Sequence, residues 1–472
     1  MLWKLERYAQ SQAIVDDCGG AITYGELAEE GRRIAQAVGG RCLVFSLCEN
    51  ALGSVVGYTA FIEGGIVPLL LNAHLDRELL RRLLETYRPA YLWAPQDQAD
   101  TFRDMEPVYG AFSYTLLKTG FGGESRLYPE LGLLLTTSGS TGSPKLVRQS
   151  YANMRANARS IAQYLQLDET ERPITTLPMN YTYGLSIINS HLLVGATILV
   201  TDKGLMQKGF WQFFRDQRAT SFGGVPYTYE MLDRLRFYRM ELPSLRTMTQ
   251  AGGKLLPELH EKFARYAEQS GKRFVVMYGQ CEATARMGYL PAEKALEKCG
   301  SMGVAIPGGR FRLVDDEGRT IVQPGVTGEL VYEGENVTLG YAQSAADLVK
   351  GDERHGVLET GDMARFDEEG YFYIVGRKKR FLKLYGNRVN LDEIDRMIGE
   401  HFAHVDHASA GVDDHMYLFT TDETRADEMR AYVSAKTGLN AAAFKTVVVS
   451  EIPRNDAGKI LYKELEKYYL DM

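Results

Sequence analysis

The 472-residue sequence predicts an α/β fold followed by an antiparallel region nearer the C-terminus. Through the first part of the chain, short apolar runs typical of buried strands alternate with helical stretches. That alternation is typical of largely parallel sheets flanked by helices. From Gly303 onward the apolar runs are separated by Asp and Gly turns instead, which is typical of an antiparallel sheet or a small barrel.

Individual elements follow from the same patterns. Buried strands are expected at 90–93, 196–200 and 274–277, helices at 151–165 and 210–218, and strands of the second region at 310–314 and 328–332. Beyond a basic cluster at 377–380, the remaining residues are expected to form a small α+β unit. Its helix begins near Asn390, because Asp392 and Glu393 fall where carboxylates stabilise the first turn of a helix.

Composition excludes several classes of protein. Hydrophobic residues make up 45% and charged residues 24%, which excludes a disordered chain, a collagen-like chain and a coiled coil. The formal net charge is -7, so nothing attracts the whole chain to nucleic acid or to anionic lipid. We therefore expect no nucleic-acid partner, and a phosphate ligand has to be held by local groups.

Cysteine usage and the N-terminus favour a cytoplasmic location. The five cysteines form no CxxC pair, and the first residues carry charges where a signal peptide needs an apolar run. The most apolar stretch, 42–71, contains Glu49, Asn50 and Glu63. We expect buried strands and helices there, and no membrane span.

A loop rich in glycine and hydroxyl residues follows the apolar run that ends at Thr136. It reads Thr137-Ser138-Gly139-Ser140-Thr141-Gly142-Ser143-Pro144-Lys145. Glycines allow backbone N–H groups to close around an anion, hydroxyls add donors and the lysine adds a positive charge. The sequence therefore predicts a polyphosphate site. It is not a Walker A loop, because the GK[ST] ending is absent.

Three later segments carry related chemistry. In Tyr278-Gly279-Gln280-Cys281-Glu282 a ring can stack on a purine, and a carboxylate can hold Mg²⁺. Asp362 lies in a Thr-Gly-Asp loop and can accept hydrogen bonds from ribose hydroxyls. Lys459 ends a polar loop near the C-terminus. Taken singly, these residues read as an ordinary turn, a turn-forming aspartate and an exposed surface lysine.

In this order, the four segments resemble those of the adenylate-forming superfamily of acyl-CoA synthetases, aryl-CoA ligases, adenylation domains and luciferases. Further matches are Gly300-Ser301-Met302-Gly303, Gly328-Glu329-Leu330, Gly340-Tyr341 and Gly376-Arg377. The resemblance implies a large N-terminal domain, residues 1–377, with two α/β sheet subdomains and a small antiparallel barrel-like subdomain. It also implies a small, mobile α+β C-terminal domain, residues 378–472, with Lys379 at the hinge.

The resemblance also implies roles for single residues. The catalytic residues would be Lys459, Glu282 and Lys145, with Glu282 also holding Mg²⁺. Tyr278 would stack on adenine opposite Gly253 and Lys254, and Asp362 and Arg377 would contact the ribose. The full ATP-binding set would be Thr137, Ser138, Gly139, Ser140, Thr141, Gly142, Gly253, Lys254, Tyr278, Gly279, Gln280, Cys281, Asp362 and Arg377. Two residues depart from the family pattern: Leu146 replaces a common glycine, and Cys281 replaces threonine.

The expected reaction is ATP-dependent activation of a carboxylic acid to an acyl-adenylate with release of pyrophosphate, followed by transfer to a thiol. Amino-acid-activating members bind the substrate ammonium with an aspartate, and Thr182 stands at that position here. Because an unpaired buried ammonium is costly, we expect a fatty, aryl or hydroxy acid. The candidate pocket rings are Tyr181, Tyr183, Phe222 and Tyr227, for each of which ordinary core packing is the alternative.

The thiol belongs either to CoA or to the phosphopantetheine of a carrier protein. The segment 385–395 resembles the corresponding part of carrier-loading adenylation domains more than that of CoA ligases. Two further alternatives stay open, namely adenylation without thiol transfer and activation of an amino acid by a stand-alone adenylation domain.

Overall fold

A computed structural model describes residues 2–121, 126–136, 145–384, 387–412, 414–454 and 460–469. The chain divides into two compact units, which we call unit 1 and unit 2. Unit 1 comprises Met1–Phe311 and Tyr332–Leu358, and unit 2 comprises Arg312–Val331 and Glu359–Met472. The divisions fall within strands β17 (Gly309–Val314) and β19 (Gly328–Gly334) and near the start of β21 (Val357–Phe366).

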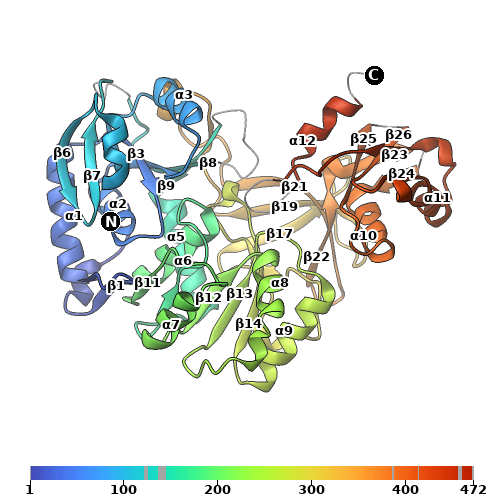
Figure 1. The fold of residues 1–472 in the computed structure, drawn as a ribbon, viewed down its shortest axis with the longest axis horizontal. Coiled ribbons are helices and arrows are strands. Elements are labelled where there is room, and N and C mark those ends of the chain that lie inside the picture. The colour runs from blue at the N-terminus through green and yellow to red at the C-terminus, as the bar shows by residue number, and fades with distance from the viewer. Residues whose placement is uncertain are drawn as a thin grey trace. The chain divides into compact units, whose positions relative to one another are not determined.

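Among the described residues, unit 1 contains two large sheets (Figure 1). The nine-stranded sheet has the order β16 (Val304–Ala305), β15 (Gly288–Tyr289), β14 (Arg273–Tyr278), β13 (Thr247–Gln250), β12 (Ser221–Gly224), β10 (Pro173–Ile174), β11 (Ile198–Val200), β1 (Gln12–Asp16), β2 (Ala21–Thr23). The eight-stranded sheet has the order β20 (Gly340–Ala342), β9 (Leu146–Ser150), β8 (Leu131–Thr136), β4 (Val67–Asn72), β3 (Leu43–Cys48), β5 (Tyr91–Pro95), β7 (Tyr114–Lys118), β6 (Glu106–Ala111).

Both sheets have parallel centres and antiparallel edges, as the alternation of strands and helices predicts. Strand β13 pairs in parallel with β12 and β14, and β4 pairs in parallel with β3 and β8. The edge pairs β1–β2, β6–β7 and β9–β20 are antiparallel. The predicted strands at 90–93, 196–200 and 274–277 correspond to β5, β11 and β14.

The helices of unit 1 are α1 (Tyr24–Val38), α2 (Leu52–Glu63), α3 (Arg77–Tyr87), α4 (Gln96–Ala99), α5 (Tyr151–Tyr164), α6 (Thr182–Leu193), α7 (Lys208–Asp216), α8 (Pro226–Arg234) and α9 (Pro257–Gln269). The predicted helices at 151–165 and 210–218 are α5 and α7. Helices α2 and α6 are buried on all sides, which places them in the core. One hydrophobic cluster joins them to strands of both sheets, including Val44 and Ile198.

Unit 2 is built around smaller sheets. In its described part, one sheet has the order β18 (Thr320–Ile321), β17, β19, β21, β22 (Phe372–Arg377). The β17–β18 and β21–β22 pairs are antiparallel, as the Asp and Gly turns predict. The remaining elements are β23 (Phe381–Leu384), β24 (Asn387–Asn390), α10 (Leu391–His401), β25 (His407–Val412), β26 (His415–Thr420), α11 (Ala426–Thr437), β27 (Phe444–Val448) and α12 (Tyr462–Leu465).

The predicted helix near Asn390 is α10, and the Asn390 side chain accepts a hydrogen bond from the Asp392 N–H. The predicted domain boundary after Arg377 stays a prediction. Lys379 belongs to the short 3-10 helix η7 (Lys378–Arg380), and its side chain lies outside the described part of the chain. No helix within the described ranges is long and apolar enough to cross a membrane.

Helix α6 carries a buried imidazole. His191 is 3% exposed, and its Nδ1 lies 2.8 Å from the Ile187 carbonyl oxygen, so the neutral ring donates there. Its Nε2 has no hydrogen-bond partner among the described residues. Burial lowers the pKa of His191 from 6.5 to about 4, and the positive charge of Arg286 is a smaller cause in the same direction.

Acidification should therefore destabilise unit 1. Between pH 6.5 and about 4 the unfolded chain binds a proton that the folded His191 does not, so stability falls as the pH falls through that window. The pKa shift corresponds to about 3 kcal/mol, present in full above pH 6.5 and lost below about pH 4. The variant His191→Asn keeps a donor near the position of Nδ1 but cannot titrate. Between pH 7 and 4 we expect its free energy of unfolding to fall by about 3 kcal/mol less than that of the natural chain.

Urea unfolding followed by tryptophan fluorescence measures this loss. It reports on unit 1 alone, because all three tryptophans, Trp3, Trp93 and Trp211, lie in that unit. Equal losses of stability in the variant and in the natural chain would contradict the prediction.

Candidate active site

Strand β9 follows the predicted phosphate loop and anchors its lysine. Residues 137–144, and with them Thr137, Ser138, Gly139, Ser140, Thr141 and Gly142, lie outside the described residues. Lys145, directly before β9, is half-buried. Its Nζ lies 3.4 Å from the centroid of the Tyr341 ring, which is a cation–π distance. Tyr341 is on β20, which pairs antiparallel with β9.

Tyr341 also contacts the predicted magnesium ligand. Its hydroxyl donates to Glu282 Oε1 at 2.7 Å, and the Arg354 guanidinium lies 4.7 Å from the centre of its ring. Arg354 Nη1 donates to the Glu282 carbonyl oxygen at 3.1 Å. One phenol ring thus contacts two cations and a carboxylate. Burial, together with the neighbouring Glu282 charge, raises the pKa of Tyr341 to about 12, so the hydroxyl stays a donor.

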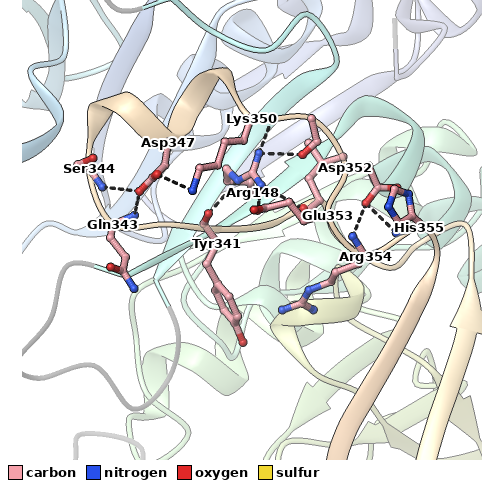
Figure 2. Close-up of polar contacts among 12 residues, drawn as sticks. Arg148, Tyr341, Gln343, Ser344, Asp347, Lys350, Asp352, Glu353, Arg354 and His355 are labelled. Carbon is pink, nitrogen blue, oxygen red and sulfur yellow. Dashed lines mark hydrogen bonds and ion pairs between the residues drawn. The ribbon is translucent and has the colours of Figure 1, made fainter.

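A fully buried arginine holds this region together (Figure 2). On β9, Arg148 Nε donates to the Tyr341 carbonyl at 3.0 Å, and Nη2 donates to the Leu339 carbonyl at 3.1 Å. Nη1 donates to the carbonyls of Lys350 and Gly351, and Nη2 also forms an ion pair with Glu353. The guanidinium therefore fixes both ends of the segment that presents Tyr341 and Arg354.

Local capping contacts order the same segment. Asp347 accepts hydrogen bonds from the N–H groups of Gln343 and Ser344 and pairs with Lys350 Nζ at 2.8 Å (Figure 2). The bond from Lys350 and those from the backbone lower the pKa of Asp347. Asp352 accepts from the N–H groups of Arg354 and His355.

The predicted adenine-binding residues surround the end of β14. Tyr278 is the last residue of that strand, and Gln280 Nε2 donates to its hydroxyl at 3.2 Å. Gly279 allows a close approach, because a Cβ at this position would lie 1.8 Å from the Ala285 carbonyl oxygen. Cys281 is buried at the start of the 3-10 helix η4 (Cys281–Ala283), which carries Glu282.

The loop after β13 carries the other predicted base contacts. Gln250 Nε2 donates to the Gly253 carbonyl at 2.9 Å and fixes the loop, and Lys254 is exposed on it. Gly252 has φ +84°, and a Cβ there would lie 2.6 Å from the Tyr181 hydroxyl oxygen. The loop therefore lies beside the first of the predicted pocket rings.

The four predicted pocket rings do not all come together. Tyr181 and Tyr183 pack edge to face with ring centres 6.4 Å apart, and the Tyr183 hydroxyl lies 2.8 Å from Thr249 Oγ1. Burial raises the pKa of Tyr181 to about 12. Phe222 packs instead against Tyr229 and Phe237, and Tyr227 is 60% exposed on α8. The structure groups only the first two rings.

In unit 2, the predicted ribose contacts lie side by side. Asp362 on β21 is opposite Arg377 on β22 in the antiparallel register, and Arg377 Nε lies 2.8 Å from Asp362 Oδ1. Asp362 is buried, whereas the arginine side chain is largely exposed. Lys459, the predicted catalytic lysine, lies outside the described residues.

Sequence reasoning assigned no role to Arg148, Arg286 or Arg354, and it used Tyr341 only as a family match. The sequence did contain a signal for Arg148, because an arginine inside a run of buried strand residues needs buried hydrogen-bond or ion-pair partners. Arg286 also lies close to Tyr183, with its Cζ 5.2 Å from the ring centre. Within the described residues, no group of three or more His, Cys, Asp or Glu side chains forms a metal cluster.

Sequence comparison shows to which known proteins this chain is similar. A sequence model of the AMP-binding enzymes matches residues 2–342. Indoleacetate–CoA ligase of Aromatoleum aromaticum is 30% identical, over 80% of this chain and 78% of the relative. A 2-succinylbenzoate–CoA ligase of Bacillus cereus is 27% identical, over 90% of this chain and 88% of the relative.

Solved structures share the fold. O-succinylbenzoate coenzyme A synthetase (MenE) from Bacillus subtilis in complex with AMP superimposes with a TM-score of 0.78 at 22% identity, covering 98% of this chain and 97% of that one. ATP-bound MatB from Rhodopseudomonas palustris gives a TM-score of 0.77 at 22% identity, with the same coverage of both chains. Since the family model spans most of the chain, the protein belongs to the AMP-binding enzymes.

Proposed function

We propose that this enzyme uses ATP and Mg²⁺ to convert a carboxylic acid into an acyl-adenylate and then transfers the acyl group to the thiol of CoA. The observation that carries the proposal is the cluster of Lys145, Tyr341 and Glu282, which puts a cation and a carboxylate on one ring directly after the phosphate loop. The names of the two relatives, both CoA ligases, support the acceptor. A carrier-protein thiol is the second candidate, favoured by the sequence of 385–395.

Glu282 fits the requirement for Mg²⁺. This ion is usually held by one or two carboxylates together with substrate phosphates and water, so a cluster of protein ligands is not needed. Glu282 Oε1 accepts from Tyr341, and Oε2 has no hydrogen-bond partner among the described residues. When bound, Mg²⁺ would neutralise charge on the phosphate oxygens.

The proposed chemistry requires positioned charge more than covalent help. A carboxylate oxygen of the acid attacks the α-phosphorus, a new P–O bond forms, and the bond to the bridging oxygen breaks as pyrophosphate leaves. Negative charge builds up at the phosphorus centre, and cations such as Lys145 and Lys459 would stabilise it. A thiolate then attacks the activated carbonyl, and AMP leaves with the electrons of the broken C–O bond.

The surroundings of Thr182 support an acid without an α-amino group. Thr182 is 7% exposed, and its Oγ1 donates to the Thr284 carbonyl oxygen. This position therefore offers no carboxylate to a substrate ammonium, whose burial without a partner would be costly. We propose an aryl, fatty or hydroxy acid as substrate.

ATP–pyrophosphate exchange with Mg²⁺ and a panel of aryl, fatty, hydroxy and amino acids tests the proposed function. We expect exchange with at least one acid that has no amino group, and thioester formation when CoA is added. Thioester formation with a carrier protein but not with CoA would show that the carrier protein, and not CoA, is the acceptor. Exchange with amino acids alone, or with no acid, would overturn the proposal.

Replacement of Lys459 should separate the two half-reactions. We expect Lys459→Ala to lower pyrophosphate exchange by at least about 100-fold, because a transition-state cation is lost. The same variant should still form thioester from a chemically made acyl-adenylate. The exposed Lys463→Ala is the matched control. An equal loss in both half-reactions, or in neither, would contradict the role of Lys459.

Tyr341→Phe tests the magnesium assignment. The variant keeps the ring that contacts Lys145 and removes only the 2.7 Å hydrogen bond to Glu282. Groups that orient a metal ligand typically contribute tenfold or more to metal affinity, so the Mg²⁺ concentration for half-maximal exchange should rise about tenfold. Tyr109→Phe, which removes a 2.6 Å bond to Glu30, should leave it unchanged. If Tyr341→Phe left the Mg²⁺ concentration for half-maximal exchange unchanged, the assignment of Glu282 as the Mg²⁺ ligand would lose its support.

A further inference from the structure

Arg286 is a buried cation that has no acidic partner in the described part of the chain. It is 2% exposed and follows the end of η4, the helix that carries Glu282, by three residues in the chain. Its Nε donates to Ser186 Oγ at 3.1 Å, and Nη1 donates to the Tyr164 hydroxyl at 3.0 Å. Among the described residues, Nη2 has no hydrogen-bond partner, and no Asp or Glu lies within ion-pair distance of the guanidinium.

The neutral contacts offset only part of the cost of burying this charge. Besides the two hydroxyls, Nη1 meets the Met277 sulfur at 3.2 Å, and the Tyr183 ring provides a cation–π contact. Removing a guanidinium from water is costly unless an anion and hydrogen bonds replace the water. Its planar group of N–H donors matches the two oxygens of a carboxylate.

Arg286 also lies next to the candidate acyl pocket. It packs on Tyr183, the ring that meets Tyr181, and all of these residues belong to unit 1 together with Glu282. A cavity of about 10 Å³, roughly the size of one water molecule, adjoins Ser186 and is lined by both polar and apolar side chains, among them Asn157, Asn189 and Ile161. The polar groups that contact the Arg286 side chain are therefore the hydroxyls of Ser186 and Tyr164.

We propose that Arg286 binds a second carboxylate of the acid, so that the enzyme activates one end of a dicarboxylic acid while Arg286 holds the other end. The proposal rests on the proposed function and narrows its substrate class. Arg286 is then a specificity-determining residue, since it contacts the substrate away from the reacting carboxyl group. The second carboxylate of the substrate would supply the negative charge that the described residues do not place next to Arg286.

Matched substrate pairs test the assignment. We would measure pyrophosphate exchange by the full chain with dicarboxylic acids, such as adipic, homoterephthalic and 2-succinylbenzoic acid, and with their monomethyl esters. Each ester keeps the skeleton and removes one charge. The natural enzyme should prefer at least one dicarboxylate over its ester by about 100-fold in kcat/KM, because a site built for a charged partner rejects the neutral analogue.

Variants show whether Arg286 is the cause. Arg286→Met should abolish the preference by lowering kcat/KM for the dicarboxylate, with the ester unchanged or better, and Arg286→Lys should keep part of it. Arg172→Met is the matched control, because Arg172 is a half-buried arginine that donates to Gln217. It should keep the full preference. Tryptophan fluorescence melting checks that unit 1 is folded in each variant.

The outcomes separate two kinds of failure. Exchange by the natural chain with monoesters or simple monocarboxylic acids in preference to every dicarboxylate would overturn the role of Arg286 and leave the proposed function standing. A preference that survives in a folded Arg286→Met variant would do the same. Absence of exchange with every acid would overturn the proposed function itself.

Discussion

The candidate site depends on one buried guanidinium. Arg148 is wholly inside the protein and bonds four carbonyl oxygens and one carboxylate that belong to a segment far away in the sequence. A guanidinium has five N–H donors in a rigid plane, so these partners fix where the segment can lie. Tyr341 and Arg354 reach Glu282 from this segment, and Lys145 stands three residues before Arg148. Arg148 therefore contributes mainly by fixing where the other charged and polar groups of the site lie.

The contrast with Arg286 is informative because both arginines are buried in the same unit. Arg148 meets enough oxygen acceptors to offset its desolvation, as a structural arginine should. Arg286 meets two hydroxyls, a thioether and an aromatic face. Such a group is well held but incompletely neutralised, which is the condition of a binding residue whose counter-charge arrives with the ligand.

Local sequence was sufficient for the α/β class, the strands β5 and β14, the helix α5 and the change to antiparallel pairing. These features depend on periodicity and turn residues that are close together in the chain. Candidate site residues could be chosen from the sequence only where a motif carries its own chemistry, as in the segment from Tyr278 to Glu282, and their roles stay predictions. The hydrogen bonds from Arg148 to Tyr341, from Tyr341 to Glu282 and from Arg286 to Ser186 join residues 193, 59 and 100 positions apart, and no local pattern encodes these pairings. The roles of Lys459 and the phosphate loop still rest on the family resemblance.

Gly340 lies directly beside the ion pair of Arg148 and Glu353. Its φ is +121°, and a Cβ there would lie 2.7 Å from Glu353 Oε2 and 3.1 Å from Arg148 Nη2. A side chain at position 340 therefore competes for the space that the ion pair fills. Glycine at position 340 therefore meets two requirements at once, the positive φ at the first residue of β20 and the room that the Arg148–Glu353 ion pair occupies. Replacing Arg148 would remove only the second requirement, because the left-handed backbone at position 340 would still favour glycine.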